Sequence, residues 1–321
     1  MMATEHYPVM LEESVEALAL GTGAAERVVD ATFGGGGHAR RILRELGHEG
    51  RLVGIDRDPY AVRRASELME EDRRFTFMPG AYDEVLGNLV EEDVKADAVL
   101  FDLGLSSYQI DEAGRGFSYV QEGPLDMRMD PGRGESAADF LNTAQAARIV
   151  EVLVRYGDVP RAEARRVAGE IVRRRPLGTT VELSHAVRSA VGWKERGGNP
   201  AKKVFQAVRV YINDEIGGLE RALGAVERLL APGGRLVAIT FHSGEDRVVK
   251  RFIHERTGLC VCLPELPVCA CGARPIFRKG VVRRPSTREI EENPRSASAR
   301  LRSAVRTSEP LDADGSLGGA S

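Results

Sequence analysis

A glycine-rich stretch near the N-terminus and an acid farther along the chain have the types and spacing of a nucleotide-binding site. The stretch reads Asp30-Ala-Thr-Phe-Gly-Gly-Gly-Gly-His38 and joins the β-branched run at residues 26–29 to the helix-forming residues 39–46. Glycines at such a turn let the backbone approach a ligand, and the first amides of the helix point outward with a positive partial charge. Asp56 ends the next β-branched run, where a carboxylate can accept two hydrogen bonds from a ribose diol. We therefore expect an adenosine derivative as the ligand.

The glycines alone leave the identity of this ligand open. Gly34, Gly36 and Ala39 satisfy the G-x-G-x-x-A pattern of dinucleotide-binding proteins, so NAD is an alternative to S-adenosylmethionine. A tight turn without any ligand is a third interpretation. The two cofactors predict different enzymes, a nicotinamide-dependent oxidoreductase or a methyltransferase, and the rest of the chain must distinguish them.

Strands and helices alternate around these residues. We expect strands at residues 27–32, 52–56, 75–78 and 96–102, and a helix at residues 59–69. Such alternation implies a parallel sheet covered on both faces, with ligands at the carboxyl ends of its strands. Tyr82, after the third strand, and Asp102, at the end of the fourth, are therefore expected at the same edge as Gly36 and Asp56.

After Asp102 the alternation stops. Helical segments are expected at residues 136–155, 160–174, 180–191 and 200–211, and then a helix at 219–230 and a fifth strand at 235–242 restore the alternation. Residues 280–285 and 296–306 are expected to pair as antiparallel strands that close the sheet. We infer a helical insertion at the ligand-facing end of the fourth strand, where it can form the substrate side of the site.

The composition indicates a globular protein whose charge is unevenly spread. Hydrophobic residues make up 42% of the 321 residues and the net charge is −3, with no apolar run long enough for a membrane span and no signal segment. Residues 160–211 nevertheless hold 12 Lys/Arg against 4 Asp/Glu, and residues 278–306 hold 9 against 3. From the missing span and signal segment we expect a cytoplasmic protein. Two basic regions on an acidic background favour a protein that meets a polyanion on one side, although solvated helix faces are an equal alternative for the first region.

The cysteines follow an unusual pattern, C-x-C-x6-C-x-C, formed by Cys260, Cys262, Cys269 and Cys271. On a hairpin, positions i and i+2 share a face, so the four sulfur atoms are able to meet and hold a structural zinc. The usual zinc spacing is wider, so free thiols remain the first interpretation, with disulfides last for a cytosolic chain.

Several motifs together closely resemble the bacterial methyltransferases that modify N4 of a cytidine in 16S ribosomal RNA. The motifs run in order along the chain: His6-Tyr-Pro-Val-Met, Asp30–His38, Phe101-Asp-Leu-Gly-Leu-Ser-Ser-Tyr-Gln109, Arg115-Gly-Phe-Ser118, Gly123-Pro-Leu-Asp-Met-Arg-Met-Asp130, Val204-Phe-Gln-Ala-Val-Arg209, Phe241-His-Ser243 and Asn293-Pro-Arg-Ser296. The chain departs from the family pattern at Gly244 and Lys202, both near the expected RNA side.

This resemblance implies a fold, a cofactor and a substrate. The fold is a class I methyltransferase, a doubly wound, mostly parallel α/β sheet of seven strands with an inserted all-helical domain. Residues 1–107 and 205–307 would form the methyltransferase domain, residues 108–204 the insert and residues 308–321 a disordered tail. The cofactor is S-adenosylmethionine, and the substrate is a P-site cytidine of 16S ribosomal RNA in the small subunit, with no DNA or membrane partner. By motif position, the cofactor contacts are Gly36, Gly37, His38, Asp56, Tyr82, Asp102 and Gln109.

Methylation of a cytosine amine limits the catalytic candidates. The amine is a poor nucleophile because its lone pair is delocalised into the ring, so the enzyme must align it with the methyl donor and accept its N–H hydrogen bonds. Asp102 is the expected acceptor, unless it binds the amino group of the cofactor instead. Ser106, Ser107, His242 and Ser243 are further candidates. The target base must leave its stack to reach the methyl donor. Phe117 and Tyr119 would either stack on this base or anchor their own loop. Five arginines are expected to contact RNA phosphates: Arg283, Arg284, Arg295, Arg300 and Arg302.

Overall fold

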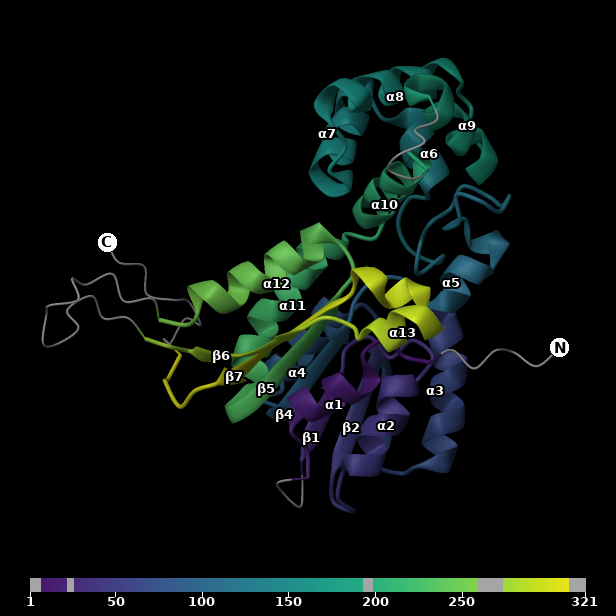
Figure 1. The fold of residues 1–321 in the computed structure, drawn as a ribbon. Coiled ribbons are helices and arrows are strands. Elements are labelled where there is room, and N and C mark those ends of the chain that lie inside the picture. The colour runs from purple at the N-terminus through teal and green to yellow at the C-terminus, as the bar shows by residue number, and fades with distance from the viewer. Residues whose placement is uncertain (1–6, 22–25, 193–198, 259–273, 312–321) are drawn as a thin grey trace, which may run out of the picture. The chain divides into compact units, whose positions relative to one another are not determined.

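Two compact units make up the chain. The computed structural model describes residues 7–21, 26–192, 199–258 and 274–311. The sheet unit comprises residues 1–104 and 217–321, and the helical unit comprises residues 105–216 (Figure 1). No helix within the described ranges is both long enough and apolar enough to cross a membrane.

A sheet of seven strands forms the centre of the sheet unit. Its strands are β1 (Arg27–Asp30), β2 (Arg51–Asp56), β3 (Phe75–Pro79), β4 (Ala96–Asp102), β5 (Leu230–Thr240), β6 (Phe277–Arg283) and β7 (Arg300–Arg306), in the order β3-β2-β1-β4-β5-β7-β6. The first five pair in parallel, and β7 runs antiparallel to both β5 and β6. The expected doubly wound, mostly parallel sheet is confirmed, as is the antiparallel closing pair.

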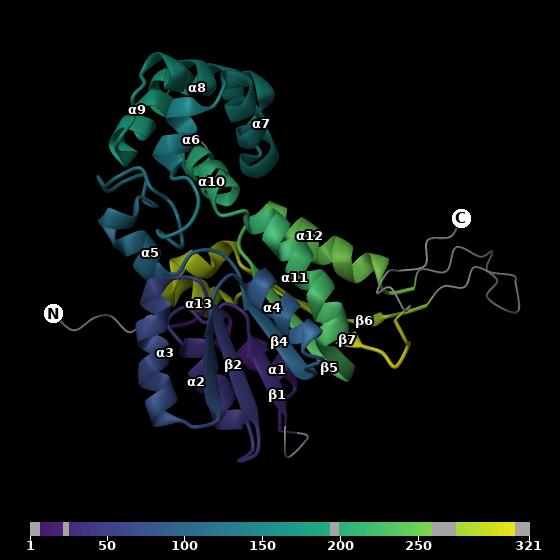
Figure 2. The same cartoon turned by 180° about the vertical axis from the view of Figure 1, so that it is seen from behind.

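Helices cover both faces of this sheet. They are α1 (Leu11–Leu18), α2 (Gly37–Glu45), α3 (Pro59–Glu71), α4 (Tyr82–Glu91), α11 (Glu215–Leu229), α12 (Ser243–Glu255) and α13 (Thr287–Glu292), with a 3-10 turn at Pro294–Ser298. Apolar residues of α1, α2 and α3 share one buried cluster with residues of β1, β2, β4 and β5. Seen from behind, α4 and α11 lie in front of the sheet (Figure 2). The central strand β4 is buried on both faces along most of its length, which explains its nearly continuous apolar run.

The helical unit has its own hydrophobic core. Its helices are α5 (Ser107–Asp111), a 3-10 turn (Ala113–Arg115), α6 (Ala137–Thr143), α7 (Ala146–Gly157), α8 (Arg161–Arg173), α9 (Thr180–Val191) and α10 (Ala201–Ile212). The core includes Ile149 and Leu153 of α7 together with Val204 and Val208 of α10. The unit therefore extends to residue 216 instead of residue 204, because the apolar face of α10 is buried within it.

Other boundaries also differ from the expectations. The helix expected at residues 136–155 is two helices, because Ala144 and Gln145 have extended backbone between them. The helices α4, α12 and α13 were not among the expected elements. Strand β5 ends at Thr240 because His242 caps α12. Residues 312–321 of the expected tail and all four cysteines lie outside the described residues.

Candidate active site

Three aspartates stand at the carboxyl ends of neighbouring parallel strands in the sheet unit. Asp30 ends β1, Asp56 ends β2 and Asp102 ends β4, and β1 pairs with both β2 and β4. Neighbouring parallel strands end at the same edge of a sheet, so the three carboxylates share this edge. The edge is where the sequence predicted a ligand.

The glycine-rich turn between β1 and α2 is fixed to the second of these strands. The N–H of Gly34 donates to Asp56 Oδ2 at 2.8 Å, and the N–H of Asp58 donates to Asp56 Oδ1 at 2.9 Å. Gly36 has φ of 79° at the N-cap of α2, a left-handed conformation that favours glycine, and a Cβ there would lie 2.8 Å from the Phe33 ring. The turn is therefore held close to Asp56, and the first amides of α2 follow it directly.

Burial raises the pKa of Asp56, against the lowering effect of the two backbone N–H groups. Each carboxylate oxygen has two lone pairs, so both Asp56 oxygens retain acceptor capacity after these bonds. A ribose diol placed at this strand end would find two acceptors already fixed in position by the turn.

The carboxyl groups of Asp30 and Asp102 have fewer hydrogen-bond donors around them than that of Asp56. Asp30 is fully buried, and burial raises its pKa to about 7, with the Asp56 carboxylate adding to the shift. Burial also raises the pKa of Asp102 well above its usual value, and the carboxylates of Asp30 and Glu245 add to it. Asp30 Oδ2 and Asp102 Oδ1 are buried atoms without a hydrogen-bond partner among the described residues. A buried acceptor of this kind costs free energy unless a ligand supplies the donor.

The backbone of Asp102 is held by a hydrogen bond, and its carboxyl group lies beside a histidine. The N–H of Asp102 donates to Thr32 Oγ1 at 2.6 Å, and His38 Nδ1 lies 3.5 Å from Asp102 Oδ2. Burial lowers the pKa of His38 to about 4, against the effect of the backbone carbonyl of Val9, so the imidazole is neutral at pH 7. His38 therefore stands beside the Asp102 carboxyl group without placing a positive charge there.

The other predicted contact residues have different positions. Gly37 and His38 are the first two residues of α2, so their backbone N–H groups belong to the turn that has no acceptor within the helix. Tyr82 begins α4, and its ring packs edge-on against Phe101 at a centroid distance of 5.7 Å. Gln109 belongs to the helical unit, where its side-chain oxygen accepts the Ser106 N–H at 2.9 Å in a capping box. The structure therefore groups the predicted residues of the sheet unit, while the role of Gln109 stays a prediction.

The charge at this edge favours a cation-bearing nucleoside. The groups that act on Asp30 and Asp102 are other carboxylates, and neither aspartate is paired with a Lys or Arg in the described ranges. The raised pKa values of both groups reflect burial beside other carboxylates, and the sulfonium and ammonium of S-adenosylmethionine would stabilise their ionised forms. The pyrophosphate of NAD carries negative charge and would meet them unfavourably. These carboxylates therefore fit S-adenosylmethionine better than NAD.

Comparison with known proteins agrees with this chemistry. A sequence profile described as the MraW methylase family matches residues 3–307. The chain belongs to the MraW methylase family. The sequence is also 68% identical to a ribosomal RNA small subunit methyltransferase H of Rubrobacter xylanophilus, covering 97% of this chain and 98% of that protein. A protein of the same name from Bordetella petrii is 44% identical, over 98% and 93% of the two chains.

Solved structures are similar at a lower level. A putative methyltransferase from Streptococcus mutans in complex with SAH has 12% identity and a TM-score of 0.43, covering 92% of this chain and 97% of that chain. For the methylase described here, the family confirms the resemblance stated above, the class I methyltransferase fold and S-adenosylmethionine as the cofactor.

Sequence reasoning missed two residues of the methylase site, Thr32 and Glu245. Glu245 is buried, and its carboxylate accepts the N–H of Phe241 at 2.8 Å and the N–H of His242 at 3.2 Å. His242 Nδ1 in turn accepts the N–H groups of Gly244 and Glu245, so the ring caps α12. The E-D sequence three residues after His242 was a capping-box signal for this arrangement.

Three of the arginines expected to contact phosphates are engaged within the methylase itself. Arg300 and Arg302 both bind the Asp246 carboxylate, with shortest distances of 2.8 and 2.7 Å, and Arg283 binds Glu16 at 2.5 Å. Their positive charges are therefore partly compensated within the chain, and their contact with RNA phosphates stays a prediction. Arg284 and Arg295 are exposed, and their role stays a prediction.

The glycine-rich loop of the helical unit is anchored by its aromatic and charged residues. Phe117 is buried in the core of that unit, and the ring of Tyr119 packs edge-on against Phe205 at a centroid distance of 6.1 Å. Asp126 and Arg128 form a bidentate pair at 2.7 and 2.8 Å. These contacts favour the anchoring interpretation of both aromatic residues over stacking on a base.

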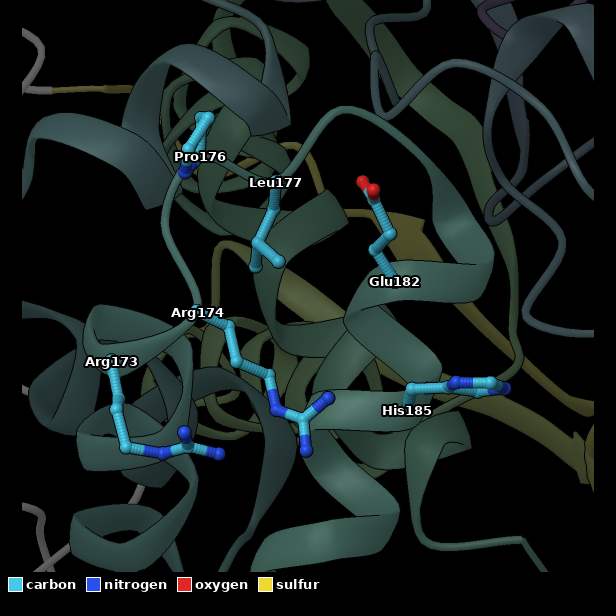
Figure 3. A pocket seen from close by; sticks show the side chains of 6 residues that line it. All are labelled: Arg173, Arg174, Pro176, Leu177, Glu182 and His185. Atoms are coloured by element: carbon cyan, nitrogen blue, oxygen red, sulfur yellow. The ribbon is translucent and has the colours of Figure 1, made fainter.

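A hollow of about 460 Å³ opens in the helical unit beside α8 and α9. In Figure 3, Arg173 and Arg174 lie on the left, and Glu182 and His185 of α9 lie on the right. The Glu170 carboxylate binds both Arg173 and Arg174, with shortest distances of 2.6 Å. The two guanidinium charges are therefore partly compensated, which makes the hollow a weak anion site on its own.

Proposed function

We propose that this methylase transfers the methyl group of S-adenosylmethionine to the exocyclic N4 of a P-site cytidine in 16S ribosomal RNA, within the small ribosomal subunit in the cytoplasm. The observation that carries the proposal is the set of three carboxylates at one sheet edge, Asp30, Asp56 and Asp102, in a chain of this methylase family. The high identity to small subunit methyltransferases of other bacteria supports the choice of substrate.

The cofactor would be held by groups that the sheet unit already fixes. Asp56 would accept the ribose hydroxyls, since the N–H groups of Gly34 and Asp58 hold its carboxylate in place. The backbone N–H groups of Gly37 and His38 would donate to polar atoms of the same ligand. S-adenosylmethionine supplies an already activated methyl group, so the residues have to bind, align and stabilise charge.

Asp102 is the proposed residue at the reacting amine. Its Oδ1 atom has no hydrogen-bond partner among the described residues, while its backbone N–H is bound by Thr32 and its Oδ2 atom faces His38. A carboxylate oxygen oriented in this way can accept an N–H of the cytosine amine and stabilise the positive charge that develops on nitrogen. The ammonium of the cofactor is the alternative partner for the same oxygen.

The helical unit is proposed to bind the RNA. Arg161, Arg165 and Arg166 of α8 are exposed and form no salt bridge among the described residues, unlike Arg173 and Arg174. Exposed, uncompensated guanidinium groups on one helix bind RNA phosphates by charge and by bidentate hydrogen bonds. Flipping of the target base is least costly where the RNA is single-stranded.

The proposal is tested by incubating the protein with S-adenosylmethionine labelled in its methyl group and with small subunits that lack the modification. Digestion of the RNA and nucleoside analysis should find the label in N4-methylcytidine. Subunits first treated with protein and unlabelled cofactor serve as the control and should accept little label. Label in another nucleoside would contradict the proposed substrate, and binding of the subunit without any transfer would indicate a non-catalytic assembly factor.

A further inference from the structure

Two motifs at opposite ends of the sequence meet beside the glycine-rich turn, and the proposed mechanism uses neither of them. The first is the N-terminal arm at residues 7–10, and the second is the segment at residues 286–296 that contains α13. Figure 1 shows α13 beside the purple N-terminal segment. The Met10 N–H donates to Glu289 Oε1 at 2.7 Å, and the Asn293 amide donates to the Tyr7 carbonyl at 3.5 Å.

The arm packs directly on the start of α2. A Cβ added to Gly37 would lie 2.2 Å from Pro8 Cγ, so the proline ring lies against the backbone of the first residue of α2. The next residue, Val9, is buried, and its carbonyl faces the His38 imidazole. The arm therefore contacts two residues whose backbone amides are proposed to bind the cofactor.

The backbone conformation of the arm at Met10 is stabilised by hydrogen bonds from other segments of the chain. Met10 is fully buried and has φ of 50° and ψ of 40°, a left-handed conformation that is strained for a residue with a side chain. Its carbonyl accepts the N–H and the hydroxyl of Ser14 at 2.9 and 2.7 Å, while its N–H is bound by Glu289. The Ser286 hydroxyl, which accepts the Glu289 N–H at 3.1 Å, fixes the start of α13.

We propose that Glu289 is a positioning residue for the methyl donor, acting through the arm on the first turn of α2. By binding the Met10 N–H it holds Pro8 on Gly37 and Val9 on His38. His38 in turn lies 3.5 Å from Asp102, so the same contacts fix the position of the imidazole beside the proposed catalytic carboxylate. This inference rests on the proposed cofactor site.

The test compares three variants of the full chain, Glu289→Ala, Glu289→Gln and Glu291→Ala. Glu291 is an exposed glutamate of the same helix and serves as the matched control. Calorimetric titration with S-adenosylmethionine should show affinity about 10-fold weaker for Glu289→Ala, the scale of one hydrogen bond to a charged group. Glu289→Gln should stay within about 3-fold of the unmodified protein, because its amide oxygen still accepts the Met10 N–H. Glu291→Ala should be unchanged.

A further variant tests whether Glu289 acts on the first turn of α2 through Pro8. Pro8→Ala removes the ring from Gly37, and combined with Glu289→Ala it should weaken binding no more than about the larger single effect, since the two residues act in series. Wild-type affinity in Glu289→Ala, even with a lowered melting temperature, would overturn the inference and leave only a structural role. Failure of the unmodified protein to bind S-adenosylmethionine would instead refute the proposed function.

Discussion

The carboxylates at the edge of the sheet unit and those of the helical unit differ in how they are compensated. In the helical unit Asp126 binds Arg128, Glu170 binds Arg173 and Arg174, and Glu215 binds Arg209. At the sheet edge Asp30 and Asp102 face other carboxylates, and each keeps one buried oxygen without a partner in the described ranges.

The difference separates residues that stabilise the fold from residues that await a ligand. A paired acid lowers the free energy of the folded chain or costs little, whereas a buried, uncompensated one destabilises it. Substitution should therefore have opposite effects on the two groups, with lost stability in the helical unit and gained stability but lost function at the sheet edge.

The largest effect is expected for Asp102→Ala, which should abolish turnover. The substitution removes the only proposed acceptor for the reacting amine, while Thr32 still binds the backbone at this position. Methyl transfer under single-turnover conditions is the measurement, and Asp102→Asn, which keeps the side-chain shape, is the companion variant. Full activity in Asp102→Ala would remove this residue from the site.

Arg209→Ala should destabilise the helical unit by about 3–5 kcal/mol, the cost of removing one partner from a buried ion pair. Glu215 accepts two hydrogen bonds from Arg209 at 2.7 and 2.6 Å, and both side chains are largely buried. Chemical denaturation measures the change, with Arg165→Ala as the control on the exposed face of α8. Equal stability of the two variants would show that the comparison between the units is wrong.

Asp30→Asn should stabilise the free protein at high pH. The folded-state pKa of Asp30 is raised to about 7 by burial, so the folded chain binds more protons than the unfolded chain between about pH 4 and pH 7. Stability therefore falls as the pH rises through this window, and the neutral amide removes that loss. The free energy of unfolding of the variant, relative to that of the unmodified protein, should rise by about 2–4 kcal/mol as the pH is raised from 4 to 8. Unfolding curves at several pH values measure it, and a constant difference would exclude a titrating Asp30.

Asp56→Ala is expected to weaken cofactor binding by about 1.5–3 kcal/mol, the scale of a lost hydrogen bond to a charged group. The N–H groups of Gly34 and Asp58 lose their acceptor as well, so the turn should loosen. Titration with S-adenosylhomocysteine reports the affinity. Unchanged binding would count against the ribose assignment.

Much of the fold could be predicted because period and composition determine it locally. The apolar runs of β2 and β4 and the turn at Gly36 identify strands and a strand-to-helix junction, and parallel topology then brings Asp56 and Asp102 to one edge. The start of α4 was missed because Gly80 and Ala81 resemble a loop, and α12 was missed because His242 was assigned to a strand end.

Partners distant in sequence could not be predicted. Arg300 and Arg302 are 54 and 56 residues from Asp246, so composition gave their charge but not the acid that binds it. The roles of Glu245 and Glu289 could not be predicted for the same reason, since each glutamate binds backbone groups that only the folded chain brings near. Charge counts along the sequence therefore overestimate the cations available to RNA.

The most direct measurement is the crystal structure of this methylase with S-adenosylhomocysteine bound. The account predicts the ribose hydroxyls on the Asp56 carboxylate, the glycine-rich turn against the ligand, and the amino-acid end beside Asp30 and Asp102. A ligand bound away from the ends of β1, β2 and β4, or a ribose held by another residue while Asp56 stays on Gly34 and Asp58 alone, would contradict it.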